Sequence, residues 1–277
     1  MFDPLADQRD TRALARALRA HALRMVHHAN ASHIGTCLSM ADLLAVLYGA
    51  TLRARPEQPG WPRRDRFILS KGHGAAILYA ALAERGFFPT EWLARYCDDG
   101  APLAGHVTHH EVPGVEHSTG SLGHGLAVGC GMALAGKAEG ADHRVVVLLS
   151  DGELDEGSNW EAILFAPHHR LDNLIAIVDY NKIQSFGRVE QVLSLEPLAA
   201  KWRAFEWAVR EIDGHDHAQI IASLRETPAE SGRPTVILAH TVKGKGVSFM
   251  EDELAWHYRS PNDEQLALAL AEVAREL

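Results

Sequence analysis

The chain has 277 residues, of which 47% are hydrophobic, so it is long enough to form one elaborate α/β domain with a substantial core. Its formal net charge of −9 comes without a basic tail or stripe, which argues against nucleic-acid binding as the main function. The sequence contains no apolar run of the roughly 18 to 20 residues that a membrane span requires, and its N-terminal stretch lacks the apolar segment of a signal peptide.

The first part of the chain predicts helices separated by loops. Apolar residues recur on one stripe over residues 10–29 and predict an amphipathic helix, and a second helix is expected over 40–48. A loop rich in proline and charge follows at 56–64. A short strand is then expected at 67–69, followed by a helix over 75–84 that stops at a glycine.

The middle of the chain begins with a long irregular segment, which a helix and three apolar runs follow. Residues 97–120 are irregular and contain Gly, Pro and His, and a loop of this length inside a compact domain is usually functional. A helix of small residues is expected over 122–138. Three apolar runs, at 145–149, 174–178 and 235–239, then indicate buried parallel strands.

Helical segments lie between and around these strands. They are expected at roughly 156–166, 197–208 and 216–226, with an acidic C-terminal helix over 262–277. Strands that alternate with helices predict a doubly wound, mostly parallel α/β sheet flanked by helices. We expect residues 1–277 to form a single domain with helical extensions at both ends.

Three cysteines, Cys37, Cys97 and Cys130, are scattered along the chain. Their spacing is not that of a metal site, and an odd number gives no obvious disulfide framework. A reducing, cytoplasmic compartment fits this pattern.

The most informative segment runs from residue 144 to 187. One strand ends in the sequence SDG at Asp151, and the next ends in DYN at Asn181, thirty positions later. In a right-handed strand–helix–strand unit both strands deliver their carboxyl ends to the same edge of the sheet. Asp151 and Asn181 are therefore expected to lie close together, at the edge where open α/β sheets bind ligands.

The residue types at this edge suit magnesium. Mg²⁺ prefers six oxygen ligands and usually takes only one or two carboxylates together with phosphates. Asp151 offers a carboxylate and Asn181 an amide carbonyl, and the backbone carbonyl of Ile183 completes the protein ligands. A diphosphate supplies further oxygens, because Gly152 lets the backbone approach it and the following helix N-terminus favours its negative charge.

This segment resembles the thiamine-diphosphate motif of the transketolase family, which normally reads GDG and, after a gap, Asn. Here Ser150 replaces the first glycine, a small departure at a strand end. The alternative is an ordinary strand–turn–helix with a capping Asp. The resemblance implies a thiamine-diphosphate-binding fold of the pyrophosphate type, with thiamine diphosphate and Mg²⁺ (or Ca²⁺ or Mn²⁺ in its place) as cofactors.

Further segments resemble the N-terminal half of transketolase in the same chain order. They are NASHIG at His33, DRFILSKGHG at His73, the GH pair at His106, GVEHSTGSLGHG at residues 114–125, and TVKGKGVSFMEDELAWH at His257. Within the fourth segment His124 stands where the family usually has Gln. The resemblance runs from about residue 10 to 260.

The resemblance implies that four histidines, His33, His73, His106 and His257, surround the thiazolium and the substrate. Imidazoles that titrate near neutrality donate and accept protons when carbon–carbon bonds of a ketose are broken and formed, and they stabilise oxyanions. A lone histidine is more often a packed or surface residue. That is our expectation for the unmatched histidines His27, His28, His109, His110, His168 and His169.

The family also places the loop at 120–122 against the cofactor aminopyrimidine. The implied cofactor-binding set is His73, Gly120, Ser121, Leu122, Asp151, Gly152, Glu153, Asn181, Ile183 and His257. Glu156 matches a glutamate of a carboxylate network at the subunit interface and joins the catalytic set. Its alternative reading is a first-turn helix acid favoured by the dipole, and Glu161 is a weaker match of the same kind.

One departure follows the last histidine. Related sequences continue with Gly after the Trp-His pair, whereas this chain has Tyr258 and Arg259. The bulkier pair is expected to reshape the substrate channel. Arg259 either binds a phosphate or carboxylate or lies in solvent.

The resemblance also implies a partner. In the family, the glutamate that activates the cofactor lies in a second, pyrimidine-binding domain, and nothing in these 277 residues resembles that domain. We therefore expect a separate C-terminal subunit to supply it, in a heterotetramer of two copies of each chain.

The function that we expect is transfer of a two-carbon ketol (glycolaldehyde) unit from a ketose to an aldehyde-type acceptor, with sugars or sugar phosphates as substrates. An alternative is a 2-oxoacid decarboxylating component that delivers an acyl or glycolyl unit to a lipoyl or carrier protein. A non-catalytic, scaffolding relative is a third reading, but it predicts loss of the metal ligands, and Asp151 and Asn181 are present. The sequence does not identify donor or acceptor.

Overall fold

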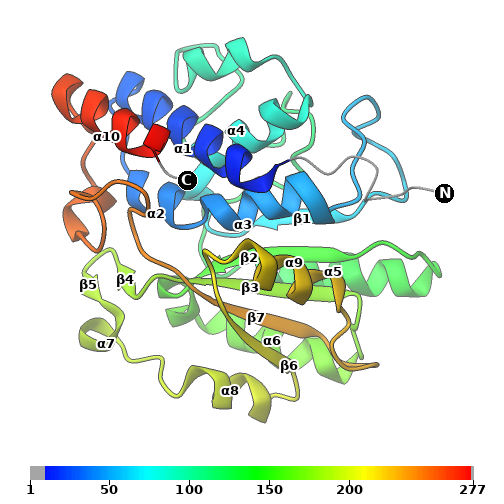
Figure 1. The fold of residues 1–277 in the computed structure, drawn as a ribbon. Coiled ribbons are helices and arrows are strands. Elements are labelled where there is room, and N and C mark those ends of the chain that lie inside the picture. Colours follow the sequence, from blue (N-terminus) through cyan, green and yellow to red (C-terminus); the bar gives the residue numbers. More distant parts are fainter. Residues whose placement is uncertain (1–9, 276–277) are drawn as a thin grey trace.

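A computed structural model describes residues 10–275, and its centre is a five-stranded parallel sheet (Figure 1). The strands in spatial order are β1 (Arg66–Leu69), β2 (Val145–Ser150), β3 (Leu174–Tyr180), β7 (Thr235–His240) and β6 (Ala208–Asp213). Helices cover both faces, which confirms the doubly wound α/β sheet. The N-terminal residues 1–9 and the end of the predicted C-terminal helix, 276–277, lie outside the described residues.

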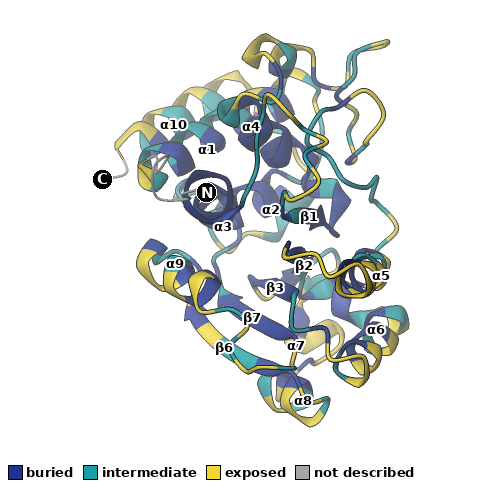
Figure 2. Ribbon diagram, turned by 90° about the vertical axis from the view of Figure 1, so that its right-hand side faces the viewer, coloured by how far each residue is buried: buried dark blue, intermediate teal, exposed yellow. Residues whose placement is uncertain are grey.

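Side chains along each strand point alternately to the two faces of the sheet, so the core has two layers. Val146 and Ile175 point to the face that is covered by α1 (Thr11–His28), α3 (Ala41–Val46), α4 (Ala75–Arg85) and α9 (His217–Arg225). Val147 and Ala176 point to the opposite face, under α5 (Gly125–Ala138), α6 (Gly157–His168) and α8 (Leu198–Ala204). The strands are therefore buried on both sides, as Figure 2 shows, and this explains their nearly continuous apolar runs.

Shorter elements connect these layers. They are α2 (Ile34–Ser39), the π-helical turn η1 (Leu47–Thr51), the 3₁₀ turns η2 (Gly72–Gly74), η3 (Thr90–Arg95), η4 (Gly152–Asp155) and η5 (Leu254–His257), the hairpin strands β4 (Ile183–Gln184) and β5 (Gly187–Arg188), α7 (Val189–Val192), and α10 (Asp263–Arg275). α10 packs against α1, so the two ends of the described chain meet on one face.

Most predicted elements are present, with three differences at their boundaries. The helix expected over 40–48 begins at Ala41 and is divided between α3 and η1, and the helix expected from 122 begins at Gly125. The helix expected over 197–208 ends at Ala204, because Ala208 begins the edge strand β6. β6 was not predicted, since its sequence AVREID buries only Ala208 and Ile212 and therefore lacks an apolar run.

Small residues let α5 lie directly on the sheet. A Cβ atom added to Gly129 would lie 2.5 Å from Cγ2 of Val147, so this position has no room for a side chain. Gly125 is similarly tight against Ser70. The glycines of α5 therefore fix the distance between this helix and β2.

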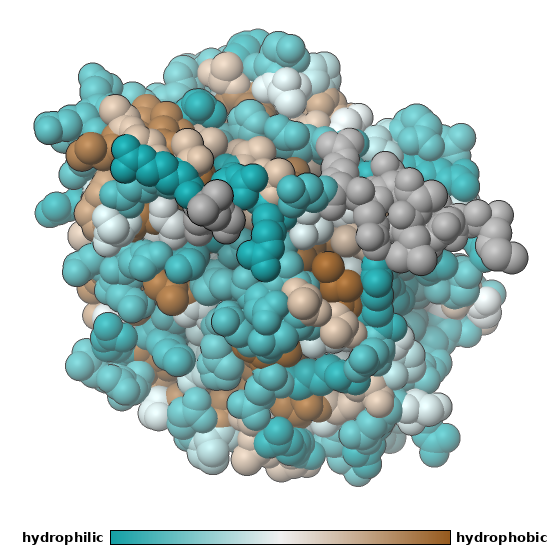
Figure 3. Space-filling model, viewed as in Figure 1, coloured by the Kyte–Doolittle hydropathy of each residue, from teal (hydrophilic) through white to brown (hydrophobic). Residues whose placement is uncertain are grey.

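The face of the molecule in Figure 3 is mainly hydrophilic, with apolar residues in scattered groups. Among residues 10–275, no helix is both long enough and apolar enough to cross a membrane.

Candidate active site

The carboxyl ends of the parallel strands carry the predicted motif residues to one edge of the sheet. Ser150 at the end of β2 pairs in register with Asp179 of β3, so Asp151 and Asn181, which follow these strands, emerge side by side. A cavity of about 260 Å³ opens there. It is lined by His33, Thr36, His73, His106, Gly120, Leu122, Ser150, Asp151, Gly152, Glu153, Asn181, Ile183, Gln184, Ser185, Lys243 and His257.

Four imidazoles from four separate segments meet in this cavity. The ring centroid of His33 is 4.9 Å from that of His73 and 5.2 Å from that of His257. The centroids of His33 and His106 are 6.2 Å apart. The structure thus brings together all four histidines that the family resemblance singled out.

Backbone contacts fix the segments that carry these rings. His33 has a left-handed backbone (φ 75°), and its N–H donates to the carbonyl of His257 at 2.9 Å. The Tyr79 hydroxyl donates to the carbonyl of His106 at 3.0 Å. Gly72 allows the long loop to approach η2, since an added Cβ would lie 2.4 Å from the backbone of Thr119. The 97–120 segment is therefore ordered around the cavity.

Burial keeps three of these imidazoles neutral. Burial, with the charges of His106 and Lys243, lowers the pKa of His33 to about 4. Burial and the neighbouring Lys243 lower the pKa of His257 to about 3, and burial holds the pKa of His73 well below its ordinary value. At neutral pH these rings each hold one N–H donor and one acceptor nitrogen, which suits hydroxyl and carbonyl groups of a substrate.

The proposed metal ligands form a compact group of oxygens. Asp151 is buried, and its carboxylate accepts hydrogen bonds from the N–H of Gly152 at 2.7 Å and from the N–H of Lys182. The side-chain oxygen of Asn181 accepts from the N–H of Ile183 at 3.1 Å. Burial and the nearby charge of Asp179 raise the pKa of Asp151, so this carboxylate lacks full compensation by the protein. A cation with oxygen ligands fits such a group.

No cluster of three or more His, Cys, Asp or Glu side chains that could hold a metal exists among the described residues. A metal at this edge therefore needs amide and carbonyl oxygens and ligand phosphates in addition to the Asp151 carboxylate. That donor set matches the preference of Mg²⁺ for few carboxylates and several other oxygens.

Lys243 is a cavity residue that the sequence reasoning did not single out. Its ammonium group donates to the carbonyl of Ile183 at 2.7 Å and lies 3.0 Å from Nδ1 of His257. Burial lowers the pKa of this lysine. A buried cation beside the proposed metal ligands is suited to a phosphate group. Thr36 and Gln184 also line the cavity without having been predicted.

A second buried cation, Lys71, lies next to Asp179, the neighbour of Asp151. Lys71 forms an ion pair with Asp179, and both side chains are fully buried. Ser39 and Thr241 also donate to the same carboxylate. These bonds hold the pKa of Asp179 below its ordinary value against the effect of burial, so this neighbour of Asp151 stays ionised.

Two predicted residues do not line the cavity. Ser121 is exposed beside the lining residues Gly120 and Leu122, and Glu156 is exposed at the N-cap position of α6. Glu153 does line the cavity, where it accepts from the Ser70 hydroxyl and from the N–H of Gly123.

The histidines without a family match lie elsewhere. His27 and His28 pair with Asp263 and Asp98, at 2.9 and 2.8 Å. Both histidines thus form contacts at the surface of the molecule, as expected for histidines outside the family motifs.

Tyr258 contacts two residues that line the cavity, Ser185 and His257. Its hydroxyl donates to the carbonyl of Ser185 at 2.8 Å, and its ring centroid is 4.9 Å from that of His257. The residue thereby ties the segment after η5 to the β4–β5 hairpin. Arg259 beside it is exposed.

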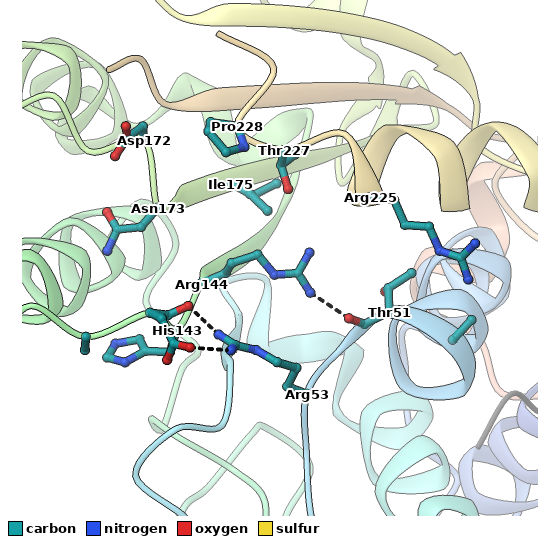
Figure 4. A pocket seen from close by; sticks show the side chains of 13 residues that line it. Thr51, Arg53, His143, Arg144, Asp172, Asn173, Ile175, Arg225, Thr227 and Pro228 are labelled. Atoms are coloured by element: carbon teal, nitrogen blue, oxygen red, sulfur yellow. Dashed lines mark hydrogen bonds and ion pairs between the residues drawn. The ribbon is translucent and has the colours of Figure 1, made fainter. Parts of the chain in front are cut away.

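A larger cavity, of about 480 Å³, lies at the opposite edge of the sheet, where β2 and β3 begin (Figure 4). Arg53 and Arg144 on its wall both bind the Asp65 carboxylate, at 3.0 and 2.8 Å. The motif residues are absent from its lining, so the candidate active site is the smaller cavity at the carboxyl edge.

Comparison with known proteins decides the family. The family described as transketolase, thiamine diphosphate binding domain, matches residues 10–271. The chain belongs to the transketolase family. This transketolase chain is therefore a transferase component that binds thiamine diphosphate together with a divalent metal, and its oxygen-rich cavity edge fits both groups.

Relatives of similar length are themselves named as subunits. The transketolase chain is 42% identical over 269 residues to the 6-deoxy-6-sulfo-D-fructose transketolase subunit SqwG of Clostridium sp., a match that covers 97% of this chain and 98% of that protein. It is 42% identical over 259 residues to one of the subunits of the apulose-4-phosphate transketolase of Phocaeicola vulgatus, covering 94% and 92% of the two chains.

Solved transketolases share the fold. The structure of transketolase from Leishmania mexicana superposes with a TM-score of 0.90 at 32% identity, and that from Campylobacter jejuni with 0.89 at 32%. These matches cover 97% and 95% of this transketolase chain but only 42% of each solved chain. The chain thus corresponds to less than half of these longer transketolases.

Proposed function

We propose that this chain is the diphosphate- and metal-binding subunit of a two-subunit transketolase. In this role it takes part in transfer of a two-carbon ketol unit from a ketose to an aldehyde-type acceptor. The observation that carries the proposal is the meeting of Asp151, Asn181 and four imidazoles in one cavity at the carboxyl edge of the sheet. When bound, thiamine diphosphate supplies the group that adds to the ketose carbonyl and accepts its electrons.

The protein ligands of the metal are proposed to be Asp151, Asn181 and the carbonyl of Ile183. Lys243 is proposed to neutralise the diphosphate, and Gly152 to let the backbone approach it. Support comes from the buried carboxylate with its raised pKa and from the contact of Lys243 with the Ile183 carbonyl.

The four histidines are proposed to bind and orient the substrate. Because burial lowers the pKa of His33 to about 4, this ring presents a neutral N–H and a lone pair at neutral pH. A neutral ring accepts a proton from a substrate hydroxyl and returns it within the same site. His257, which lies against Lys243, is proposed to stand between substrate and cofactor.

A partner chain is proposed to complete the site with the pyrimidine-binding domain and its glutamate. The relatives named as subunits, which match over 92% or more of their own length, support a site that is divided between two chains. An exposed apolar face on α5 and α6 supports assembly: the side chains of Leu134, Leu164 and Phe165 are 37%, 63% and 38% exposed. We propose a heterotetramer of two copies of each chain, with Glu156 at the interface.

The proposed substrates are sugars or sugar phosphates. The relatives are named for 6-deoxy-6-sulfo-D-fructose and for apulose 4-phosphate, and each name specifies a sugar with an anionic group. We propose that residues 1–277 act as one domain, since the first and last described helices, α1 and α10, pack against each other. The free thiols of Cys37, Cys97 and Cys130 fit the reducing cytoplasm that we propose as its compartment.

Reconstitution of the chain with its partner subunit tests the proposal. A panel of ketose phosphates and 2-oxoacids is incubated with an aldehyde acceptor, thiamine diphosphate and Mg²⁺. We expect a ketose to lose two carbons and release a shortened aldose. Release of CO₂ from a 2-oxoacid without ketol transfer would contradict the proposal and favour an oxoacid component.

A further inference from the structure

The β4–β5 hairpin lies beside the active-site cavity and is a very small element (Figure 1). Its antiparallel ladder has two pairs, which join residues 183–184 to residues 187–188. A two-stranded hairpin is at best marginally stable by itself, so contacts with the rest of the chain hold it in place. Its position matters, because Ile183 carries a proposed metal-binding carbonyl, and Ile183, Gln184 and Ser185 all line the cavity.

Two contacts of the hairpin involve groups that also face the proposed cofactor. The N–H of Lys182, just before the hairpin, donates to the Asp151 carboxylate. The carbonyl of Ile183 accepts from the ammonium of Lys243 at 2.7 Å. In the proposed function Asp151 binds the metal and Lys243 neutralises the diphosphate. Both groups are therefore shared between the hairpin and the cofactor.

Tyr258 supplies a contact that is not shared in this way. Its hydroxyl donates to the carbonyl of Ser185, in the turn of the hairpin, at 2.8 Å. The described residues that line the cavity include Ser185 and His257 but not Tyr258, so the hydroxyl reaches the hairpin from outside the cavity. The side-chain amide of Gln184 adds a further outer contact, to Oδ2 of Asp155 at 3.1 Å.

Tyr258 is itself fixed to the histidine side of the cavity. Its ring centroid is 4.9 Å from that of His257, and its carbonyl accepts from the Ser32 hydroxyl at 3.0 Å. The next residue, His33, donates its N–H to the carbonyl of His257 at 2.9 Å. The tyrosine therefore joins the segments of two cavity histidines to the hairpin that carries the Ile183 carbonyl.

We propose that Tyr258 is a positioning residue that holds the β4–β5 hairpin against the cavity and thereby strengthens binding of the metal and the diphosphate. The inference rests on the proposed function, in which the carbonyl of Ile183 binds the metal. Without the Tyr258 hydroxyl the hairpin opens more often, and the open hairpin takes this carbonyl away from the metal. The cofactor then binds only the closed fraction, so its apparent Kd rises as that fraction falls.

Hydrogen exchange of the chain alone tests the tether without any cofactor. Tyr258→Phe removes the hydroxyl and keeps the ring. We expect it to speed exchange of the hydrogen-bonded amides in residues 182–189 by about two- to tenfold, the usual worth of one hydrogen bond, with exchange elsewhere unchanged. No change at 182–189, or faster exchange throughout the chain, would overturn the proposal.

Tyr79→Phe is the matched control for this substitution. It removes a hydroxyl that donates to the carbonyl of His106 at 3.0 Å, so it breaks the same kind of bond in another segment of the cavity wall. We expect the exchange of residues 182–189 to stay unchanged in this variant. An equal increase there in both variants would overturn the assignment to Tyr258.

Calorimetric titration of thiamine diphosphate with Mg²⁺ into the chain and its partner subunit tests the effect on the site. We expect Tyr258→Phe to weaken binding by at least about twofold, and by no more than the increase in hairpin opening, whereas Tyr79→Phe keeps the unmodified affinity.

Two results would overturn the role of Tyr258 alone. One is unchanged affinity in Tyr258→Phe. The other is weakening by Tyr258→Ala without weakening by Tyr258→Phe, since the ring and not the hydroxyl would then be responsible. Absence of Mg²⁺-dependent binding by the unmodified pair would instead contradict the proposed function, and this role with it.

Discussion

Burial sets the pKa values of single residues in the active site: it raises the pKa of an acid and lowers the pKa of a base. The carboxyl of Asp151 has a raised pKa because burial and Asp179 oppose its charge, whereas the imidazole of His33 has a pKa lowered to about 4. An undercompensated carboxylate favours a cation, and a neutral imidazole favours hydroxyl and carbonyl groups. The same cavity therefore offers one part that is suited to a cation and another that is suited to the hydroxyl and carbonyl groups of a substrate.

The pKa of His33 gives a pH prediction. Between pH 4 and about 6.5 the unfolded chain binds a proton at this residue that the folded chain does not. The contribution of His33 to folding stability is therefore present above about pH 6.5 and is lost as the pH falls toward 4. In NMR spectra, the ring signal that disappears in His33→Gln should titrate near pH 4. A midpoint near 6.5 would contradict the buried, neutral state.

A second residue-level prediction separates substrate binding from cofactor binding. His106 lines the cavity with its ring centroid 6.2 Å from that of His33, on the side formed by the 97–120 segment and not by the strand ends that carry Asp151 and Asn181. We expect His106→Ala to lower kcat by about 10²–10⁴-fold, the usual contribution of a proton-transferring group, with cofactor affinity unchanged. Steady-state kinetics and cofactor titration of the reconstituted enzyme check this. A variant that loses cofactor instead would disprove the assignment.

Sequence patterns located some of these residues better than others. Asp151 and Asn181 were predictable, since strand ends of a parallel sheet meet at one edge. Lys243 was not, because the segment TVKGKG contains two lysines, and only folding decides that Lys243 lines the active site while Lys245 does not. Glu156 had a family match, but the fold leaves it on the surface of this chain.

At the scale of elements, apolar runs predicted the central strands β2, β3 and β7, which are buried on both faces. The edge strand β6 exposes Glu211 and Asp213 and pairs only with β7, so its sequence carried no comparable pattern. Helix boundaries shifted where no glycine or proline marks them, as at the change from α3 to η1 between Val46 and Leu47.

The packing of α5 on β2 supplies a prediction with a matched control. Gly129→Ala would place a Cβ 2.5 Å from Val147, and such overpacking costs about 1–3 kcal/mol of unfolding free energy. Gly131→Ala on the same helix meets no atom within 4 Å and should stabilise by about 0.5–1 kcal/mol through helix propensity. Urea unfolding of the isolated chain measures both. Equal effects at the two positions would contradict the close contact.

At the scale of the whole molecule, the chain corresponds to less than half of the solved transketolases that share its fold. The apolar residues exposed on α5 and α6 lie on the outer surface of one helical layer. Covering such a face is favourable because it removes apolar area from water. This face is therefore where we expect another subunit to pack.

Introducing a charge at this face tests its role in assembly. Leu164 on α6 is 63% exposed, and Leu164→Glu should lower the mass of the reconstituted assembly because a buried, unpaired charge opposes association. Leu268→Glu on α10, where the leucine is 54% exposed, is the control and should leave the mass unchanged. Sedimentation velocity distinguishes them. An unaltered assembly with Leu164→Glu would exclude this face as the interface.

The central claim, that Asp151 and its neighbours hold the cofactor through a metal, is tested most directly by calorimetry. Thiamine diphosphate is titrated into the chain and its partner subunit, with Mg²⁺ or with EDTA. We predict binding that requires Mg²⁺, is lost in Asp151→Ala, and is retained in Asp172→Ala, whose carboxylate lies at the opposite edge of the sheet. Binding of equal affinity in EDTA, or by Asp151→Ala, would contradict the account.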